Sequence, residues 1–357
     1  MKKKKILITS PSLDTNKNVS GISTLTNLLI KNNLNFSYHH FKVGREDNQK
    51  RNLAWILNQL KLITLFTIKL IREKFDFIHI NMPLSELAII INFILIIISK
   101  SLFKNVIIHL RGGKLSLNDN INIFQFYIIY FSLKFSNIVI VLGLKEKKYI
   151  SKKFSINNRK IHVLANAVEL TKFKKKTNFN EIQIVFLGRI DKNKGIDYIL
   201  TALKKLKNEI PFKFYLAGTG PYQNICVPKF SKYLGKKFVF LGIQNHDEKK
   251  VIFSKSHIFI LPSFFEGLPN ALLESMAYGM VPIVTSVGSI GEVVKNNKNG
   301  IIVPKRNDIL IADNIINLYK NNILYNDLSM SAYNTIKKNF SINTYIDKLN
   351  KIYYSEI

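Results

Sequence analysis

Cysteine, acidic residues and long uninterrupted apolar runs are scarce in this sequence. The 357 residues include one cysteine, Cys226, which excludes an internal disulfide framework and fits a reducing compartment. The sequence has no D-x-D motif and no cluster of His, Asp and Glu at metal-ligand spacing. We therefore expect neither a disulfide nor a bound metal ion.

The longest apolar run, Leu87–Ile98, has twelve residues and includes Asn92. As a helix it would be about 18 Å long, against about 30 Å of membrane hydrocarbon. The segment Ile121–Phe135 is also apolar but has polar interruptions. We expect both to be buried or interfacial helices and not membrane spans. The run after the basic N-terminus, Ile6–Ile8, is too short for a signal peptide and predicts a first strand.

Apolar runs of strand length alternate with helical segments in both halves of the chain, as in parallel doubly wound sheets. The length is sufficient for two α/β domains. Because the hydrophobic pattern breaks near Lys174–Glu181, we expect one domain over residues 1–175 and a second over 176–340. A last helix is expected over residues 341–357.

Two acids, Glu266 and Glu274, lie on either side of a predicted strand-to-helix turn. The apolar run before Glu266 predicts a buried strand, and a helix is expected to open near Asn270. Gly267 and Pro269 favour a tight bend that leaves free backbone N–H groups at the helix start, where anions bind. If the stretch were all helix, the acids would be about 12 Å apart, which exceeds the roughly 5–9.5 Å of glycoside hydrolase pairs. They are therefore interpreted as acceptors for different parts of one elongated, hydroxyl-rich ligand.

This E-x7-E arrangement and the segments that follow it, Ala277–Thr285 and Gly288–Val294, resemble family 4 of the retaining, nucleotide-sugar-dependent glycosyltransferases. Further segments match in the family's order: Val163–Phe173, Gly188–Gly195, Ala217–Pro221, Phe238–Gly242 and Asn299–Pro304. The N-terminal half matches more weakly, at Ser20–Gly21, Asp76–Pro83 and Ile107–Gly113. The resemblance implies the GT-B fold, which has two Rossmann-like doubly wound domains facing across a cleft. It also implies that the last helix crosses back to the N-terminal domain. Because ligands bind outside the carboxyl ends of parallel strands, the site is expected in the cleft.

Arg189 and Lys194 follow a predicted strand in the segment that begins at Gly188. By resemblance, these two cations stabilise the negative charge that grows on the departing diphosphate, in place of a metal ion. The structural alternative is two solvated charges on the surface of a lysine-rich protein.

The same resemblance assigns the ribose hydroxyls to Glu274 and the donor sugar to Glu266. Alternatively, Glu274 is an exposed helix residue and Glu266 caps the helix start through its dipole. The backbone of the turn is expected to contact the phosphates or the sugar through Gly267, Leu268, Pro269 and Asn270. Gly188 belongs to the same donor site. In the first domain, Gly21 would let the backbone approach the diphosphate, or is a simple turn glycine.

The segment Ile107–Gly113 departs from the family pattern. Many relatives have a histidine directly before this glycine pair, where this chain has Arg111, with His109 two residues earlier on the same strand face. Arg111 can bind a phosphate or an acidic acceptor but cannot accept a proton. Both residues remain candidates for the site, and a buried histidine with a structural arginine is the alternative.

The resemblance implies a retaining enzyme that moves a sugar from a nucleoside diphosphate donor, expected to be a UDP-sugar. The expected acceptor is a saccharide or lipid-linked saccharide in surface polysaccharide biosynthesis. No residue suggests a covalent nucleophile, so a front-face displacement without cofactor is the working mechanism. Two other classes stay open: a nonenzymatic basic protein that binds nucleic acid or a membrane surface, and a nucleotide-sugar epimerase.

The formal charge of +30 favours anionic partners within a Debye length of about 8 Å. Nucleic acid is disfavoured because the lysines are dispersed, no zinc-finger spacing or RNP-like motif occurs, and the aromatic residues lie in apolar runs. Acidic lipid is a better second partner after the nucleotide-sugar. We therefore expect a cytoplasmic protein with peripheral contact to the inner face of the membrane.

Overall fold

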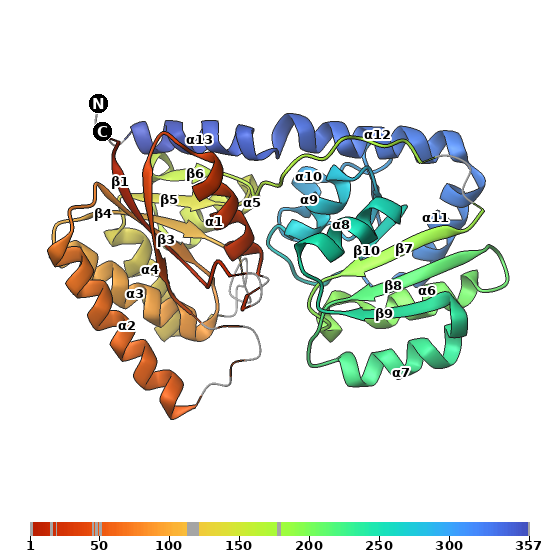
Figure 1. Cartoon of the computed structure of the whole chain (residues 1–357), viewed down its shortest axis with the longest axis horizontal. Coiled ribbons are helices and arrows are strands. Elements are labelled where there is room, and N and C mark those ends of the chain that lie inside the picture. Colours follow the sequence, from red (N-terminus) through yellow and green to blue (C-terminus); the bar gives the residue numbers. More distant parts are fainter. Residues whose placement is uncertain are drawn as a thin grey trace. The chain divides into compact units, whose positions relative to one another are not determined.

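The structure is a computed structural model that describes residues 3–14, 17–18, 20–44, 46, 49, 52–112, 121–176 and 180–355. Its contacts divide the chain into two compact units. The first unit contains Met1–Asn166 and Ile342–Ile357, and the second contains Ala167–Ser341. Each unit has a parallel sheet of six strands covered by helices, so the predicted pair of doubly wound α/β domains is confirmed (Figure 1).

The first sheet has the strand order β2-β1-β3-β4-β5-β6. Its strands are β1 (Lys5–Ser10), β2 (Ser37–Lys42), β3 (Phe77–Met82), β4 (Asn105–Leu110), β5 (Ile138–Val141) and β6 (Ile161–Val163). The helices of this unit are α1 (Gly21–Asn32), α2 (Leu53–Arg72), α3 (Glu86–Ser101), α4 (Ile123–Phe135), α5 (Leu144–Phe154) and α13 (Ile342–Tyr354).

The two faces of this sheet differ in polarity because side chains alternate along each strand. One face packs with α2, α3 and α4 into an apolar core that includes Ile78, Ile80 and Ile108. The other face turns His79 toward Tyr353 of α13, with 2.6 Å between the ring Nδ1 and the hydroxyl. Helices α1 and α13 cover this second face (Figure 1).

The second sheet has the strand order β12-β11-β10-β7-β8-β9. Its strands are β7 (Ile182–Leu187), β8 (Phe212–Ala217), β9 (Phe238–Gly242), β10 (Ile258–Leu261), β11 (Val281–Val284) and β12 (Ile301–Ile302). The helices are α6 (Ile196–Leu206), α7 (Gln223–Leu234), α8 (His246–Lys255), α9 (Asn270–Ala277), α10 (Ile290–Val293), α11 (Asp308–Lys320) and α12 (Asn322–Asn339).

The order of this second sheet reverses between β7 and β10. From β7 the chain moves outward through β8 to β9, and it then returns to β10 and continues outward on the other side to β12. In open α/β sheets, ligands bind outside the carboxyl ends of the strands at a point where the strand order reverses in this way.

The unit boundary at Asn166 lies before the pattern break near Lys174–Glu181, of which residues 177–179 lie outside the described part. The segment after Asn166 bonds the second unit: Val168 N donates to Phe340 O at 3.0 Å, and Thr171 Oγ1 donates to Ala277 O at 2.9 Å. Because these bonds tie residues 168–171 to the second unit, the boundary between the units falls closer to the N-terminus than the break in the hydrophobic pattern does.

Candidate functional site

The loops that follow β7, β10 and β11 pack backbone against backbone at the carboxyl edge of the second sheet. Phe264 N donates to Asn193 O at 2.8 Å, which joins the first two loops. Gly195 has a φ of +72°, and a Cβ on it would lie 2.3 Å from the carbonyl oxygen of Pro262. Only glycine fits this close approach, so the loops have a fixed spacing.

The third loop packs against the predicted strand-to-helix turn. A Cβ on Gly288 would lie 2.1 Å from the carbonyl oxygen of Glu266, and Ser289 N donates to Gly267 O at 3.0 Å. The backbone of the E-x7-E turn is therefore held on two sides. This rigidity supports the placement of side chains for binding.

Glu266 and Lys194 form an ion pair between the loops after β10 and β7. Glu266 Oε1 lies 2.5 Å from Lys194 Nζ and accepts a second hydrogen bond from Ser263 Oγ at 2.8 Å. The side chains are 9% and 22% exposed for Glu266 and Lys194, respectively. Among the described residues, no group bonds the second carboxylate oxygen of Glu266, so it is free to accept from a ligand.

Glu274 has a separate cationic partner. Lys249 Nζ, on α8, lies 3.1 Å and 3.0 Å from the two carboxylate oxygens of Glu274, on α9. Both side chains are mostly buried. Burial first, and then the charges of Glu274 and Glu169, raise the pKa of the neighbouring Tyr278. No motif pointed to Lys249, because it is one lysine among many and its approach to Glu274 depends on how α8 packs beside α9.

Arg189 comes directly after Gly188 and is exposed. Gly188 N donates to Ala217 O at 3.1 Å, which ties the start of this loop to the end of β8. Within the part of the chain that the structure describes, the guanidinium of Arg189 has no hydrogen bond or ion pair. The arginine therefore stands on an anchored backbone with all its donors available.

The remaining residues predicted in the second unit lie at the start of α9. Pro269 occupies the N-cap position, Asn270 begins the helix and Leu268 is buried. The structure therefore brings Lys194, Glu266 and this helix start together at the carboxyl ends of β7 and β10.

In the first unit, Gly21 is the first residue of α1 and is exposed. Its predicted neighbour Ser20 caps the helix, with Oγ accepting from Ser23 N at 3.3 Å. Gly21 thus lies at a helix N-terminus just after β1, at the carboxyl edge of the first sheet.

Arg111, at the end of β4, is held by neutral side chains. Its Nε donates to Asn81 Oδ1 at 2.7 Å, Nη1 donates to Asn166 Oδ1 at 3.0 Å, and Nη2 lies 3.5 Å from the hydroxyl of Tyr345. The side chain is half-buried, and none of the described carboxylates pairs with it. Gly113, the last residue of this predicted motif, lies outside the described residues.

His109 is fully buried on the sheet face beside His79, with 5.5 Å between the ring centroids. Burial first, then the charge of Arg111 and then His79, hold the pKa of His109 well below its usual value. The ring is therefore neutral at physiological pH. Sequence analysis left its role open, and the structure places it in the interior and not at the surface of the edge.

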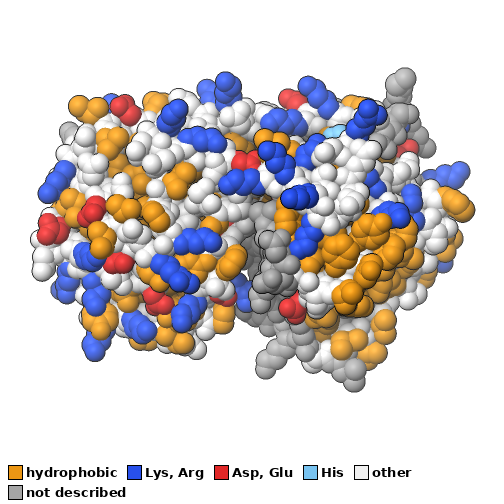
Figure 2. Space-filling view, turned by 180° about the vertical axis from the view of Figure 1, so that it is seen from behind, with side chains coloured by type: hydrophobic (Ala, Val, Ile, Leu, Met, Phe, Trp, Pro, Cys, Tyr) orange, Lys and Arg blue, Asp and Glu red, His pale blue; other side chains and the backbone are white. Residues whose placement is uncertain are grey.

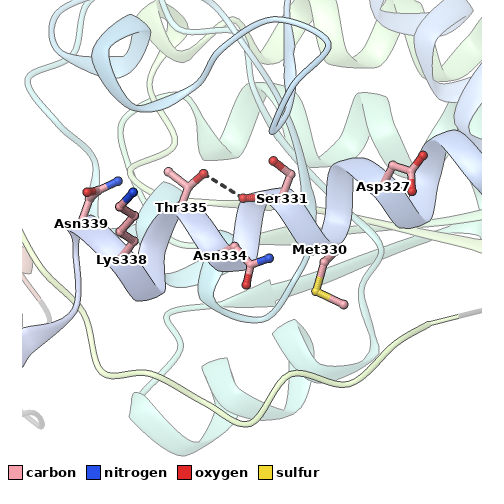
Figure 3. A pocket seen from close by; sticks show the side chains of 7 residues that line it. All are labelled: Asp327, Met330, Ser331, Asn334, Thr335, Lys338 and Asn339. Atoms are coloured by element: carbon pink, nitrogen blue, oxygen red, sulfur yellow. Dashed lines mark hydrogen bonds between the residues drawn. The ribbon is translucent and has the colours of Figure 1, made fainter.

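A cavity of about 390 Å³ lies elsewhere, along helix α12 (Figure 3). It is lined by Asp327, Met330, Ser331, Asn334, Thr335, Lys338 and Asn339. All of these side chains come from one helix, and none belongs to the predicted site. Among the described residues, no group of three His, Cys, Asp or Glu side chains is placed to hold a metal ion.

Comparison with known proteins points to a family of transferases. Residues 168–335 match the family described as glycosyl transferases group 1. The chain is 25% identical over 323 residues to an Escherichia coli UDP-Gal:alpha-D-GlcNAc-diphosphoundecaprenol alpha-1,3-galactosyltransferase, a match that covers 85% of this chain and 81% of that protein. It is 29% identical over 192 residues to an uncharacterized glycosyltransferase of Methanocaldococcus jannaschii, and the match spans about half of that protein's length (48%).

Solved structures share the fold over the whole chain. The sucrose-phosphate synthase of Thermosynechococcus elongatus has a TM-score of 0.78 at 15% identity, with 99% of both chains covered. Anabaena HepE in complex with UDP and glucose has a TM-score of 0.75 at 14% identity, with 99% of this chain and 100% of that chain covered. The two parallel-sheet units are those of the GT-B fold.

Proposed function

We propose that this chain is a glycosyltransferase that moves a sugar from a UDP-sugar to a saccharide acceptor, because residues 168–335 match the family described as glycosyl transferases group 1 and the chain has the GT-B fold. The acceptor is a saccharide or lipid-linked saccharide of a surface polysaccharide, and the anomeric configuration is retained. The E. coli relative named for UDP-Gal and a diphosphoundecaprenol acceptor supports this assignment, as does the fold shared with HepE, which was solved with UDP.

One observation supports the proposal most directly: Lys194 and Glu266 form an ion pair at the point where the strand order of the second sheet reverses. Open α/β sheets bind ligands at this switch point. An ammonium placed there donates hydrogen bonds to the phosphate oxygens of a sugar diphosphate, and a carboxylate accepts hydrogen bonds from the sugar hydroxyls.

In the proposed reaction the bond between the anomeric carbon and the diphosphate oxygen breaks while the acceptor oxygen bonds the same face of that carbon. The acceptor hydroxyl gives its proton to the departing phosphate, which balances the charge. Lys194 and Arg189 stabilise the negative charge that grows on the diphosphate, and a fixed charge of this kind lowers the barrier more than it strengthens ground-state binding. These two cations take the place of a metal ion, so no cofactor is required.

Glu274 binds the ribose hydroxyls of the nucleotide, and Lys249 holds its carboxylate in one orientation through two hydrogen bonds. Lys249 is a positioning residue in this scheme. Glu266 binds a hydroxyl of the donor sugar through its free oxygen, and the backbone at the start of α9 adds donors for the phosphate or sugar.

Arg111 binds an anionic group of a substrate in the first unit. Three neutral side chains fix its guanidinium without neutralising it, and a half-buried cation without a carboxylate partner favours an anion. The phosphate of a lipid-linked acceptor and the donor diphosphate share this chemistry. The protein acts in the cytoplasm, at the inner face of the membrane where lipid-linked saccharides are assembled.

The decisive experiment is a screen of nucleotide-sugars for release of the product nucleotide, with and without a chelator. We expect UDP release from one donor and thermal stabilisation by UDP, both unchanged by the chelator. Arg189→Ala and Lys194→Ala should lose the UDP response, whereas Lys192→Ala, an exposed lysine of the same loop, should keep it. Binding of linear DNA with a steep salt dependence and no response to any nucleotide would instead identify a nonenzymatic binder. Interconversion of the free nucleotide-sugar would identify an epimerase.

A further inference from the structure

Helix α2 has apolar side chains on two opposite sides. Its inward stripe is buried and consists of Trp55, Gln59, Phe66 and Leu70. At roughly 100° per residue, a second stripe lies on the opposite side of the helix. It includes Leu57, Leu60, Ile68 and Ile71, which are between 37% and 66% exposed, and two more exposed apolar residues, Ile56 and Leu65, lie at its flanks. The outward side of a surface helix is normally polar, so this second stripe needs an explanation.

The neighbouring helices extend the apolar surface. Helix α3 packs beside both α2 and α4. The exposed large apolar residues of α3 and α4 are Leu87, Ile94, Ile97, Ile123, Phe124, Tyr127 and Phe135. Figure 2 shows a broad apolar patch on the first unit with few charged side chains inside it. Contiguous patches of this kind mark interaction sites.

The charges on these helices are mostly positive, although Lys69 pairs with Glu73 at 2.6 Å. Helices α2, α3 and α4 contain the cations Lys61, Lys69, Arg72, Lys100 and Lys134 and one acid, Glu86. A second copy of the chain would bring a second cationic face against the first, which is repulsive. An anionic lipid surface complements both the apolar side chains and the cations.

The helix geometry indicates a helix that lies on a bilayer and does not cross it. Among the described residues, one helix, Ala54–Arg72, is long and apolar enough to span a membrane, and 22% of its apolar window is buried. Its inward stripe, however, includes Phe66 and Leu70 of the apolar core of the first unit. Lys61 is exposed within the helix and would be left in hydrocarbon by a spanning arrangement.

We propose that α2, α3 and α4 form a membrane-docking face that binds the surface of an anionic bilayer. The outward apolar side chains enter the boundary between headgroups and acyl chains, and the flanking lysines and arginine contact lipid phosphates. This face belongs to the first unit, so it does not depend on the donor residues of the second. It deepens the proposed function because a protein held at this surface meets a lipid-linked acceptor there.

The test is flotation of the full chain with vesicles of phosphatidylglycerol and phosphatidylcholine, and with vesicles of phosphatidylcholine alone. The test variant is Leu57→Gln/Leu60→Gln/Ile71→Gln. A matched control, Ile225→Gln/Ile309→Gln/Ile323→Gln, changes three comparably exposed apolar residues on helices of the second unit. We expect the test variant to lose at least tenfold in partition to anionic vesicles, the control to bind as the unchanged protein does, and phosphatidylcholine alone to bind more weakly.

Two results would overturn the proposal. One is equal binding of the test and control variants to anionic vesicles. The other is a self-association in solution that the test variant abolishes while vesicle binding persists, because a second copy would then cover the face. The UDP thermal response of the test variant checks its folding. It also separates failure of this proposal from failure of the enzymatic one, since the donor residues Lys194, Glu266 and Glu274 lie in the second unit and the docking face in the first.

Discussion

Lys194→Met should separate the catalytic role of Lys194 from its structural one. The substitution keeps most of the side-chain volume and removes the charge that pairs with Glu266 at 2.5 Å. Removing one preorganised donor to developing negative charge costs about 100-fold to 1,000-fold in kcat, or about 3–4 kcal/mol of barrier. We expect a loss of this size in kcat, with a smaller change in KM, because the charge on the diphosphate grows in the transition state.

The structural cost of the same change is smaller. Since Lys194 is 22% exposed, the pair lies between exposed pairs, worth about 0.2–1 kcal/mol, and buried ones, whose breaking costs about 3–5 kcal/mol. An intermediate loss of about 1–2 kcal/mol lowers Tm by a few degrees for a unit of this size. The protein stays folded at about 25 °C, because native domains have about 5–15 kcal/mol of stability.

The assay is initial-rate UDP release with the donor found in the screen, together with Tm from calorimetry. Lys192→Met, on the same loop and exposed, is the control and should stay within about threefold of the unchanged protein, as a surface substitution should. The reasoning is refuted if Lys194→Met keeps more than a third of kcat, or if Lys192→Met loses as much.

Three further predictions follow from particular contacts. Lys249→Ala leaves a mostly buried carboxylate unpaired, so calorimetry should show a loss between that of exposed and that of buried pairs, about 1–3 kcal/mol, and UDP should bind more weakly; unchanged UDP binding would contradict the positioning role. Burial lowers the pKa of His79 to about 3 and holds that of His109 well below its usual value, so the unfolded chain binds protons that the folded chain does not as pH falls below about 6.5. Urea denaturation should show stability present at pH 7 and declining toward pH 5, with a shallower decline in His109→Leu. Gly195→Ala should destabilise the protein by more than Gly235→Ala, because both have positive φ but a Cβ meets backbone only at Gly195; equal Tm values would show that the loop relaxes.

Local patterns were sufficient for much of the second unit. The apolar run before Glu266 forms β10, the helix begins at Asn270 as expected, and Lys194 follows β7 in the predicted loop. Hydrophobic periodicity and turn residues act within a few positions, so they can be read without knowing the fold. The two doubly wound units were predictable for the same reason.

Contacts between distant segments could not be predicted in this way. The approach of Lys249 to Glu274 and the three neutral partners of Arg111 join elements far apart in the chain. Sequence analysis identified Leu87–Ile98 as the longest apolar run, whereas among the described helices α2 has the most exposed large apolar residues.

The order of apolar runs, glycines and acids by itself determined two parallel α/β units and the position of the E-x7-E turn, because strands, helices and tight bends follow from neighbouring residues. Only the tertiary structure decided that Lys194 pairs with Glu266, that His109 is buried and neutral, and that α2 keeps an uncovered apolar side. Burial and charge pairing depend on which surfaces meet when the sheet assembles, and the identity of a residue does not specify what will pack against it.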